Sequence, residues 1–456
     1  MKETIGKELK RIFGDRAFFD NETLAVYSYD AAHTETIPEA VVFAKHETEI
    51  ASLMKLANEE RISITPRGAG SGLSGGSVPV QKGIVVCLDK MKAVKDIDIV
   101  NRLITLEAGV ITSEIDALTN PKGLFFPPDP GSVAFSTIGG NVAENAGGLR
   151  GLKYGVTKDY VKVLRTILAS GEIVSLGSKT VKHVAGYNVE QLFVGSEGML
   201  GIFSEMTLSL LPLPEHRESA LAVYNSLDDA ARTVSAIIEA GVTPSTLEIM
   251  DRFTINAIED YKSCRLPRDA EAVLLIETDG YRESAMREME KVETVAQKNK
   301  VDRFDRAKDA AERESLFEGR RVALSALARI KPTTVLEDAT VTRSRVPDLV
   351  RKVQEIAKKY SITVGTFGHA GDGNLHPTFL IDSKDADLMK RTEAAVKELF
   401  AATIEMGGTI SGEHGIGIEK KPFLKAQLGD AGVGLLRTIK KALDPNNILN
   451  PGKMFE

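Results

Sequence analysis

Three of the seven histidines lie close together in the sequence, and each stands beside or near glycine. His369 and His376 belong to the segment FGHAGDGNLH, in which Asp372-Gly373 is a typical turn between two strands. A hairpin would bring the two imidazoles together on paired strands, as a divalent cation requires. The segment therefore predicts a metal site, with hydrogen-bonded structural histidines as the alternative.

A carboxylate and the third histidine follow in the segment SGEHGIG, as Glu413 and His414. Neighbouring residues on a regular strand point to opposite faces, so both can serve one site only on an irregular loop, which the flanking glycines allow. Glu413 would complete a site of two histidines and one carboxylate with open coordination positions. His414 would remain available for proton transfer. The other histidines are expected to be structural or solvent-facing: His33, His46, His183 and His216.

A glycine-rich loop, PRGAGSGLSGG, spans Pro66 to Gly76. Its glycines match the spacing of the dinucleotide fingerprint, but Pro79 and an expected strand, Ile84–Leu88, follow where that fingerprint needs a helix. We therefore expect no nicotinamide site of the Rossmann type. The backbone N–H groups of such a loop can instead surround a pyrophosphate directly, and a plain tight turn is the alternative.

Further glycine-rich segments follow at Gly139-Gly140-Asn141, at Asn145–Gly148 and at Gly195–Gly198. Their N–H groups and amides suit a flat ring system with polar edges. The segment NPGKM near residue 453 lacks the Ser or Thr that a nucleotide-triphosphate loop places after its Lys. Several glycine-rich segments without that chemistry predict a large dinucleotide such as FAD.

The composition narrows the class of protein. The chain has 456 residues, enough for two or three domains, and a net charge of −6, which argues against a nucleic-acid partner. No uncharged apolar run reaches the roughly 18–20 residues of a membrane helix, and the N-terminus lacks an apolar signal core. Cys87 and Cys264 are too few for a cysteine-ligated iron–sulfur cluster, a cysteine zinc site or a disulfide framework. We expect a cytoplasmic protein.

The hydrophobic patterns predict the elements that position these residues. A helix is expected over Glu47–Glu60 and a hairpin over Val163–Leu176, whereas Gly131–Gly155 is too irregular for a simple element. The prolines of Leu211–Pro214 mark a domain boundary. Strands and helices alternate after it, and a helix is expected over Glu312–Ala328, which fits an α+β domain with an antiparallel sheet.

Taken together, the motifs resemble those of the FAD-linked D-2-hydroxy acid dehydrogenases, which include glycolate oxidase FAD subunits and D-lactate dehydrogenases. The resemblance covers nearly the whole chain. It rests on Pro66–Gly76, Pro127–Pro130, Thr137–Gly148, Gly186-Tyr187, Gly195–Gly198, Gly368–His376, Ser411–Gly417 and Leu443–Lys453. It implies a two-domain α+β protein with a FAD-binding domain of the vanillyl-alcohol oxidase (PCMH) type over residues 1–213. A substrate domain would occupy residues 214–416, and residues 417–456 would return to the FAD domain.

The resemblance also implies site residues. The pyrophosphate of FAD would be held by Pro66, Arg67, Gly68, Ala69, Gly70, Ser71, Gly72, Leu73 and Ser74. The rest of FAD would be held by Pro128, Asp129, Gly131, Ser132, Thr137, Gly139, Gly140, Asn141, Asn145, Gly147, Gly148, Gly198, Gly201, Ile202, Asn450 and Lys453. Ser71 stands where some relatives attach the flavin to a histidine, which implies non-covalent FAD.

By the same resemblance, His369, His376 and Glu413 match the ligands of a divalent metal, with Zn²⁺ first and Mn²⁺ or Fe²⁺ as alternatives. His414 matches the catalytic base. Arg320 matches the arginine that binds the substrate carboxylate, and Arg321 is a second candidate. The implied reaction is oxidation of a D-2-hydroxy acid to the 2-oxo acid. Leu336 stands near the place of a lysine in 2-hydroxyglutarate-specific members, which favours D-lactate or glycolate over D-2-hydroxyglutarate.

Because the chain has no cysteine cluster, the electrons must pass to a separate acceptor. An electron-transfer flavoprotein, a quinone and an iron–sulfur subunit are all open, as are a homodimer and membrane association through a partner. Three other functions also stay open. They are a non-catalytic FAD subunit of a larger oxidase, a flavin enzyme of ether-lipid synthesis, and a metal-dependent hydrolase whose glycine loop binds a phosphorylated substrate.

Overall fold

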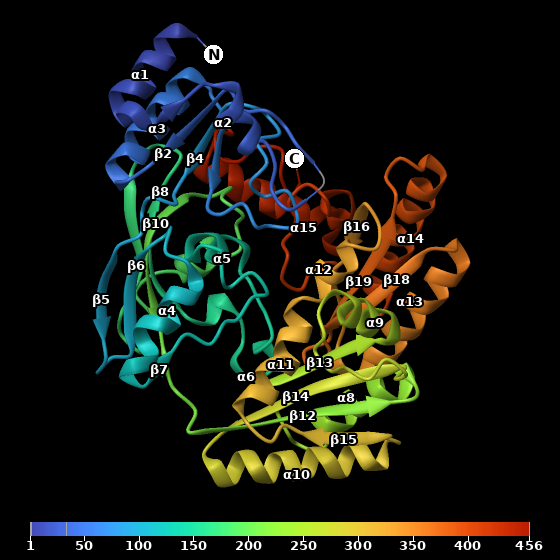
Figure 1. The fold of residues 1–456 in the computed structure, drawn as a ribbon. Helices are drawn as coiled ribbons and strands as arrows, with labels where there is room; N and C mark the ends of the chain where they lie inside the picture. Colours follow the sequence, from blue (N-terminus) through green and yellow to red (C-terminus); the bar gives the residue numbers. More distant parts are fainter. Residues whose placement is uncertain (1, 33, 456) are drawn as a thin grey trace. The chain divides into compact units, whose positions relative to one another are not determined.

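A computed structural model describes residues 2–32 and 34–455 of the chain, so that His33 lies outside the described residues. The chain forms two compact units, each built from segments far apart in the sequence (Figure 1). Unit 1 comprises Met1–Ala146, Val156–Leu213 and Glu413–Glu456, and unit 2 comprises Gly147–Gly155 and Pro214–Gly412.

Unit 1 contains a four-stranded sheet in the order β1-β2-β4-β3, in which β2, β4 and β3 run parallel. Its strands are β1 (Ala17–Phe18), β2 (Ala40–Phe43), β3 (Ile64–Arg67) and β4 (Ile84–Cys87). The β4 residues are all buried, as expected for a parallel strand covered on both faces. The predicted helix Glu47–Glu60 is confirmed as α3, whose Ile50, Leu53 and Met54 lie in the core shared with this sheet.

A second sheet of unit 1 is antiparallel, with the order β5-β6-β10-β8-β9. Its strands are β5 (Val94–Asp98), β6 (Leu103–Glu107), β8 (Val161–Ile167), β9 (Ile173–Gly177) and β10 (Ile202–Ser209), and β7 (Leu124–Phe125) pairs separately with β11 (Leu211–Pro212). The predicted hairpin is confirmed as β8 and β9. The remaining helices of the unit are α1 (Glu3–Phe13), α2 (Asn21–Val26), α4 (Thr112–Thr119), α5 (Ile138–Glu144), α7 (Val189–Phe193) and α15 (Lys421–Leu443).

The prediction that Gly131–Gly155 holds no simple element is wrong, because α5 and α6 (Gly151–Tyr154) lie within it. Glycine weakens a helix in isolation, but tertiary packing can override that preference. Thr137 caps the start of α5, and the glycines permit close packing: a Cβ added to Gly139 would lie 2.6 Å from the Cβ of Ala108. The loss of intrinsic helix propensity is thus compensated by contact with the strand layer.

Unit 2 is built on an antiparallel sheet in the order β15-β12-β14-β13-β18-β19-β16, with β17 paired to β19. The strands are β12 (His216–Tyr224), β13 (Thr246–Asp251), β14 (Ala272–Gly280), β15 (Arg303–Arg306), β16 (Thr333–Leu336), β17 (Ala339–Thr340), β18 (Thr363–His369) and β19 (Asn374–Ile381). This confirms the predicted α+β class with an antiparallel sheet.

Helices cover this sheet. They are α8 (Leu227–Glu239), α9 (Arg252–Tyr261), α10 (Arg282–Lys298), α11 (Ala310–Arg321), α12 (Ala323–Ala328), α13 (Val346–Tyr360) and α14 (Ala386–Glu405). The single helix predicted over Glu312–Ala328 is divided at Val322 into α11 and α12. Met250, Phe367 and Leu380 of the sheet share a core with Ile255 of α9 and Leu327 of α12, so these helices cover one face. None of the helices in the described ranges has the length and apolarity needed to cross a membrane.

Candidate functional site

The glycine loop of unit 1 joins two parallel strands, β3 and β4. Residues 68–83 are all described and form no helix, in agreement with the expectation that no Rossmann helix opens here. Gly70 has φ +70° and Gly75 has φ +81°, a backbone region that other residues rarely adopt. The loop therefore has the conformational freedom that wrapping an anion requires.

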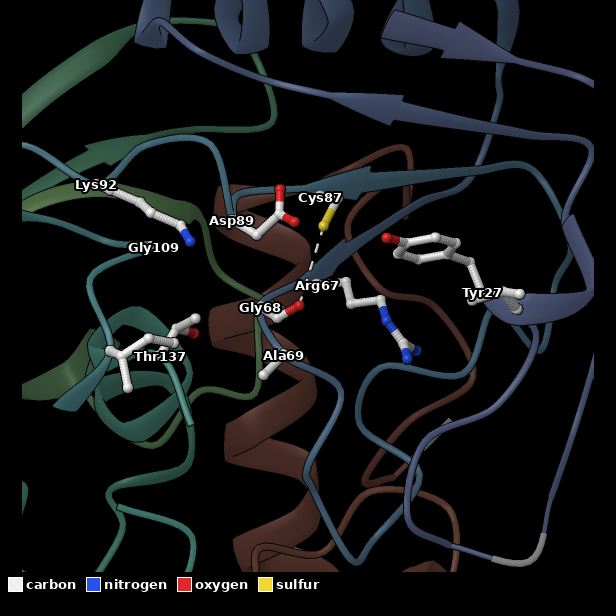
Figure 2. A pocket seen from close by; sticks show the side chains of 11 residues that line it. Tyr27, Arg67, Gly68, Ala69, Cys87, Asp89, Lys92, Gly109 and Thr137 are labelled. Atoms are coloured by element: carbon white, nitrogen blue, oxygen red, sulfur yellow. Dashed lines mark hydrogen bonds between the residues drawn. The ribbon is translucent and has the colours of Figure 1, made fainter. Parts of the chain in front are cut away.

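A cavity of about 310 Å³ lies at the start of this loop (Figure 2). Arg67, Gly68, Lys92 and Thr137 are among the residues that line it. The Arg67 guanidinium donates to the Tyr29 carbonyl oxygen at 2.6 Å and lies 5.2 Å from the centre of the Tyr27 ring, also in the cavity wall. The lining therefore holds two cations, one carboxylate (Asp89) and a glycine backbone, and this excess of positive charge fits a phosphate-containing ligand.

A second, smaller cavity of about 60 Å³ in unit 1 is lined by Pro66, Gly139, Gly140, Gly198 and Ile202, among others. Several of these glycines are places where no side chain fits. A Cβ on Gly198, which has φ +71°, would lie 2.5 Å from Pro66 Cγ, and one on Gly201 would lie 2.3 Å from Thr166 Cγ2. The predicted residues Pro66, Arg67, Gly68, Ala69, Thr137, Gly139, Gly140, Gly198, Gly201 and Ile202 all line one cavity or both.

The C-terminal segment is hydrogen-bonded to the glycine loop. The Asn450 amide donates to the carbonyl oxygens of Gly76, at 2.9 Å, and Glu197, at 2.7 Å. The Lys453 ammonium donates to the carbonyl oxygens of Gly75, at 2.9 Å, and Val78. Both side chains are buried, and burial lowers the pKa of Lys453 to about 8 despite the carboxylates nearby. Both act on loop carbonyls, which fixes the orientation of the loop peptides.

The other residues predicted to hold FAD lie outside the lining of these two cavities. In unit 1 they are Gly70, Ser71, Gly72, Leu73, Ser74, Pro128, Asp129, Gly131, Ser132, Asn141 and Asn145, whereas Gly147 and Gly148 belong to unit 2. Two side chains of this set have structural roles: the Asn141 amide donates to Thr112 Oγ1 at 2.6 Å, and Asn145 Oδ1 accepts from the Lys158 N–H at 2.8 Å. Gly131 is exposed.

In unit 2, β18 and β19 form the predicted hairpin. The register differs from a direct pairing of the two histidines, because His369 lies opposite Asn374 and His376 lies opposite Phe367. The histidines are therefore diagonal neighbours on one face, within reach of each other. Their ring centres are 5.3 Å apart at an interplanar angle of 89°, and both rings are buried.

Asp338 joins this pair. Its Oδ1 lies 3.8 Å from His376 Nδ1, and its Oδ2 accepts hydrogen bonds from Ser411 Oγ and the Gly412 N–H, both at 2.9 Å. The segment that ends unit 2 is thus fastened beside His376. Glu413 is the next residue, and it opens the last segment of unit 1, where His414 Nε2 lies 3.5 Å from Glu413 Oε1.

Arg320 stands on α11 and is buried. Its Nε donates to Glu248 Oε2 at 2.5 Å, and Glu248 Oε1 lies 2.7 Å from His369 Nδ1. The Arg320 guanidinium also lies 4.7 Å from the centre of the Phe367 ring. Burial alone would raise the pKa of Glu248, but His369 and Arg320 outweigh it and hold the pKa below its ordinary value. Arg321 instead pairs with Glu314 and is half-exposed.

Glu248 and Asp338 were not among the residues predicted from the sequence. The signal for Glu248 was an acidic residue within the apolar segment TLEIM, at a position whose neighbours are all buried. A buried carboxylate of this kind needs a charged or hydrogen-bonding partner. The sequence does not say which partner, since Arg320 and His369 are 72 and 121 residues away.

The chain matches two protein-family models. Residues 213–454 match the C-terminal domain of FAD linked oxidases, and residues 38–177 match a FAD binding domain.

Curated relatives cover nearly the whole chain. It is 48% identical to the glycolate oxidase subunit GlcD of Bacillus subtilis, over 99% of this chain and 96% of the relative. It is 33% identical to a D-lactate dehydrogenase of Anaerostipes hadrus, over 98% and 96%. Among solved structures, p-cresol methylhydroxylase with substrate bound superposes with a TM-score of 0.82 at 17% identity, over 99% of this chain and 96% of that one, a likeness that shows the fold.

Proposed function

The chain belongs to the FAD-linked oxidases, and from that premise we propose that it oxidises a small D-2-hydroxy acid, D-lactate or glycolate, to the 2-oxo acid. One observation carries the proposal. A buried arginine and two buried histidines, Arg320, His369 and His376, are joined through Glu248 and Phe367 in unit 2. This combination suits a 2-hydroxy acid, whose carboxylate and hydroxyl must be held together.

Arg320 binds the substrate carboxylate in this proposal. Its Nε is committed to Glu248, which leaves the two Nη groups to donate. A planar guanidinium suits a carboxylate because both carboxylate oxygens can accept at once. Stacking on Phe367 and the bond to Glu248 hold the guanidinium in one orientation, so that little entropy is lost when the substrate binds.

His369, His376 and Glu413 would hold the divalent cation, with Zn²⁺ first and Mn²⁺ or Fe²⁺ as alternatives. The donor set fits such an ion. The imidazoles of His369 and His376 lie on one face of the sheet. Glu413 supplies the carboxylate and directly follows Gly412, whose N–H donates to Asp338. When bound, the cation would lower the pKa of the substrate hydroxyl, as it does for water. His414 would take the hydroxyl proton.

FAD, when bound, supplies the two-electron acceptor for the hydride at the substrate Cα. We assign its binding to residues 1–213 together with the returning segment 417–456, and substrate binding to residues 214–416. Arg67, Lys92 and the glycine backbone of the larger cavity would neutralise the pyrophosphate. Ser71 offers no imidazole for attachment, so we propose non-covalent FAD.

Leu336 supports a short substrate. It ends β16 opposite Thr378, which is two residues from His376 on β19. An apolar side chain there offers no charge to a second carboxylate, which D-2-hydroxyglutarate would bring. D-lactate and glycolate have no such group.

The electrons must leave the chain, because its two cysteines cannot build an iron–sulfur relay. We propose a separate acceptor in the cytoplasm: an iron–sulfur partner subunit, an electron-transfer flavoprotein or a quinone, with any membrane attachment made through that partner.

The test is the visible spectrum of the purified protein under anaerobic conditions. D-lactate, L-lactate, glycolate and D-2-hydroxyglutarate are added separately, with and without a chelator. We expect bleaching of the flavin by D-lactate or glycolate, loss of bleaching after chelation, and its return with Zn²⁺ or Mn²⁺. A yellow protein that none of these acids bleaches would contradict the proposed oxidation and favour a non-catalytic FAD subunit.

A further inference from the structure

We propose that Glu248 is a positioning residue that couples the metal ligand His369 to the carboxylate-binding Arg320. This inference rests on the proposed function. Each oxygen of the carboxylate serves a different partner: Oε2 accepts from Arg320 Nε at 2.5 Å, and Oε1 lies 2.7 Å from His369 Nδ1. A single side chain therefore orients a residue from each half of the proposed site.

The sheet fixes Glu248 in place. In the pairing of β13 with β18, Ile249 lies opposite Gly368 and Met250 opposite Phe367. Continued by one residue, this register would place Glu248 opposite His369, in keeping with the 2.7 Å contact between their side chains. Residues directly opposite on antiparallel strands share a face. Glu248 is fully buried, so its carboxylate oxygens are shielded from bulk solvent.

The contact with His369 selects a ring nitrogen. When Nδ1 of an imidazole donates to a carboxylate, only Nε2 remains to bind a metal, and the ring orientation is fixed. The same carboxylate takes Nε of Arg320 and leaves the Nη groups to the substrate. Glu248 thus leaves Nε2 of His369 for the metal and the Nη groups of Arg320 for the substrate.

A second link runs parallel to the first. The Phe367 ring lies 4.7 Å from the Arg320 guanidinium, and its centre is 5.5 Å from that of the His376 ring, the residue opposite it on β19. Arg320 is therefore tied to one histidine through a carboxylate and to the other through an aromatic ring. A displacement of Arg320 should therefore change the positions of both imidazole rings.

The first test variant is Glu248→Gln. A glutamine has one carbonyl oxygen and one NH₂ group, so it can accept from Arg320 or from His369 but not from both. We expect the FAD-loaded variant to bind Zn²⁺ about 10- to 100-fold more weakly in competition with a fluorescent chelator. At saturating Zn²⁺, we expect KM for the substrate acid to rise by about tenfold or more, with a smaller change in kcat.

Glu277→Gln is the matched control. Glu277 is also a buried carboxylate, on the adjacent strand β14, but its bonds go to Ser219 Oγ at 2.9 Å and to Ser245 Oγ at 3.5 Å. This variant removes the same charge from the same sheet without touching His369 or Arg320. Its Zn²⁺ affinity and KM should equal those of the wild type.

A second variant tests the coupling if Glu248→Gln fails to fold. Arg320→Lys keeps the charge but loses the Nε donor, and Arg320 is not a proposed metal ligand. If Glu248 couples the two halves, this variant binds Zn²⁺ at least about fivefold more weakly than the wild type in the absence of substrate.

Wild-type Zn²⁺ affinity in both Glu248→Gln and Arg320→Lys would overturn the inference, as would an equal loss of affinity in Glu277→Gln. The proposed function is judged separately, on the wild-type protein. It fails if the wild type binds no stoichiometric cation and no 2-hydroxy acid reduces its flavin, whatever the variants do.

Discussion

Gly68→Ala tests the packing of the glycine loop against the FAD cavity. Gly68 does not have a positive φ, so alanine meets no backbone strain there. Its Cβ would lie 2.1 Å from Thr137 Oγ1, 3.3 Å from Thr137 Cβ and 3.5 Å from Thr137 Cγ2. Thr137 is the N-cap of α5, and its Oγ1 accepts from the Gly140 N–H. The loop or the cap must therefore move.

The size of the effect follows from these two contacts. Overpacking a buried contact costs about 1–3 kcal/mol, and loss of a threonine N-cap costs about 0.5–2 kcal/mol. We expect the FAD-free protein to lose about 2–4 kcal/mol of unfolding free energy. Gly68 and Thr137 both line the 310 Å³ cavity, so a displacement of either residue changes the cavity wall. If that displacement breaks one charge-assisted hydrogen bond to FAD, the affinity for FAD should fall about tenfold or more.

A rescue variant separates packing from cofactor contact. Thr137→Gly removes the clashing side chain, and glycine at an N-cap costs only a few tenths of a kcal/mol relative to threonine. We expect Gly68→Ala/Thr137→Gly to regain most of the lost stability. If FAD affinity stays low in the double variant, the loop backbone itself must approach the cofactor at Gly68.

Gly6→Ala is the control, because Gly6 lies within α1 and its added Cβ would lie 3.9 Å from the Phe19 ring, an ordinary contact. That change should raise stability by about 0.5–1 kcal/mol. Urea unfolding followed by circular dichroism, together with FAD titration by flavin fluorescence, measures both quantities. A Gly68→Ala variant within about 0.5 kcal/mol of the wild type and with unchanged FAD affinity would refute the reasoning.

Three further predictions concern unit 2 and the proposed base. His414→Ala should retain FAD and slow flavin reduction by about 10²- to 10⁴-fold in anaerobic stopped flow, and near-normal reduction would refute its role as base. Dialysis against a chelator should abolish reduction by the substrate acid while the flavin absorbance persists, and one equivalent of Zn²⁺ or Mn²⁺ should restore it; reduction unaffected by chelation would exclude the cation. Burial raises the pKa of Asp251 to about 6, although N–H bonds from Thr254 and Thr366 oppose the shift. The folded state therefore binds the Asp251 proton more tightly than the unfolded state does. The stability gained in this way is complete below about pH 4 and is lost as the pH rises through 6. Relative to Asp251→Asn, the wild type should therefore lose about 3 kcal/mol of unfolding free energy between pH 4 and pH 8, and parallel pH profiles would contradict the shift.

Local patterns in the sequence predicted local structure well. The helix over Glu47–Glu60 and the hairpin that carries His369 and His376 depend on neighbours within a few residues, so periodicity and a turn signal suffice. α5 was missed because its two glycines lower its helix propensity, and the contact that compensates for them is made with Ala108, about thirty residues earlier. Glu248 was missed for a related reason, since its role depends on partners brought together only by sheet register and by α11.

The C-terminal segment shows why the cofactor loop cannot be understood from its own residues. A loop that turns its N–H groups toward an anion turns carbonyl oxygens away from it, and buried carbonyls need donors. Lys453 and Asn450 supply these donors to Gly75, Gly76 and Val78, across 374 to 378 residues of chain. The same C-terminal segment also pairs with the edge strand β3. The Ile64 N–H donates to the Ile448 carbonyl oxygen, and Ile64 forms a parallel bridge with Leu449. Loop carbonyls and sheet edge are thus satisfied by one stretch of chain, so residues 448–453 hold the loop in its observed conformation. Removal of those donors should therefore weaken FAD binding even though neither Asn450 nor Lys453 lines the cavity.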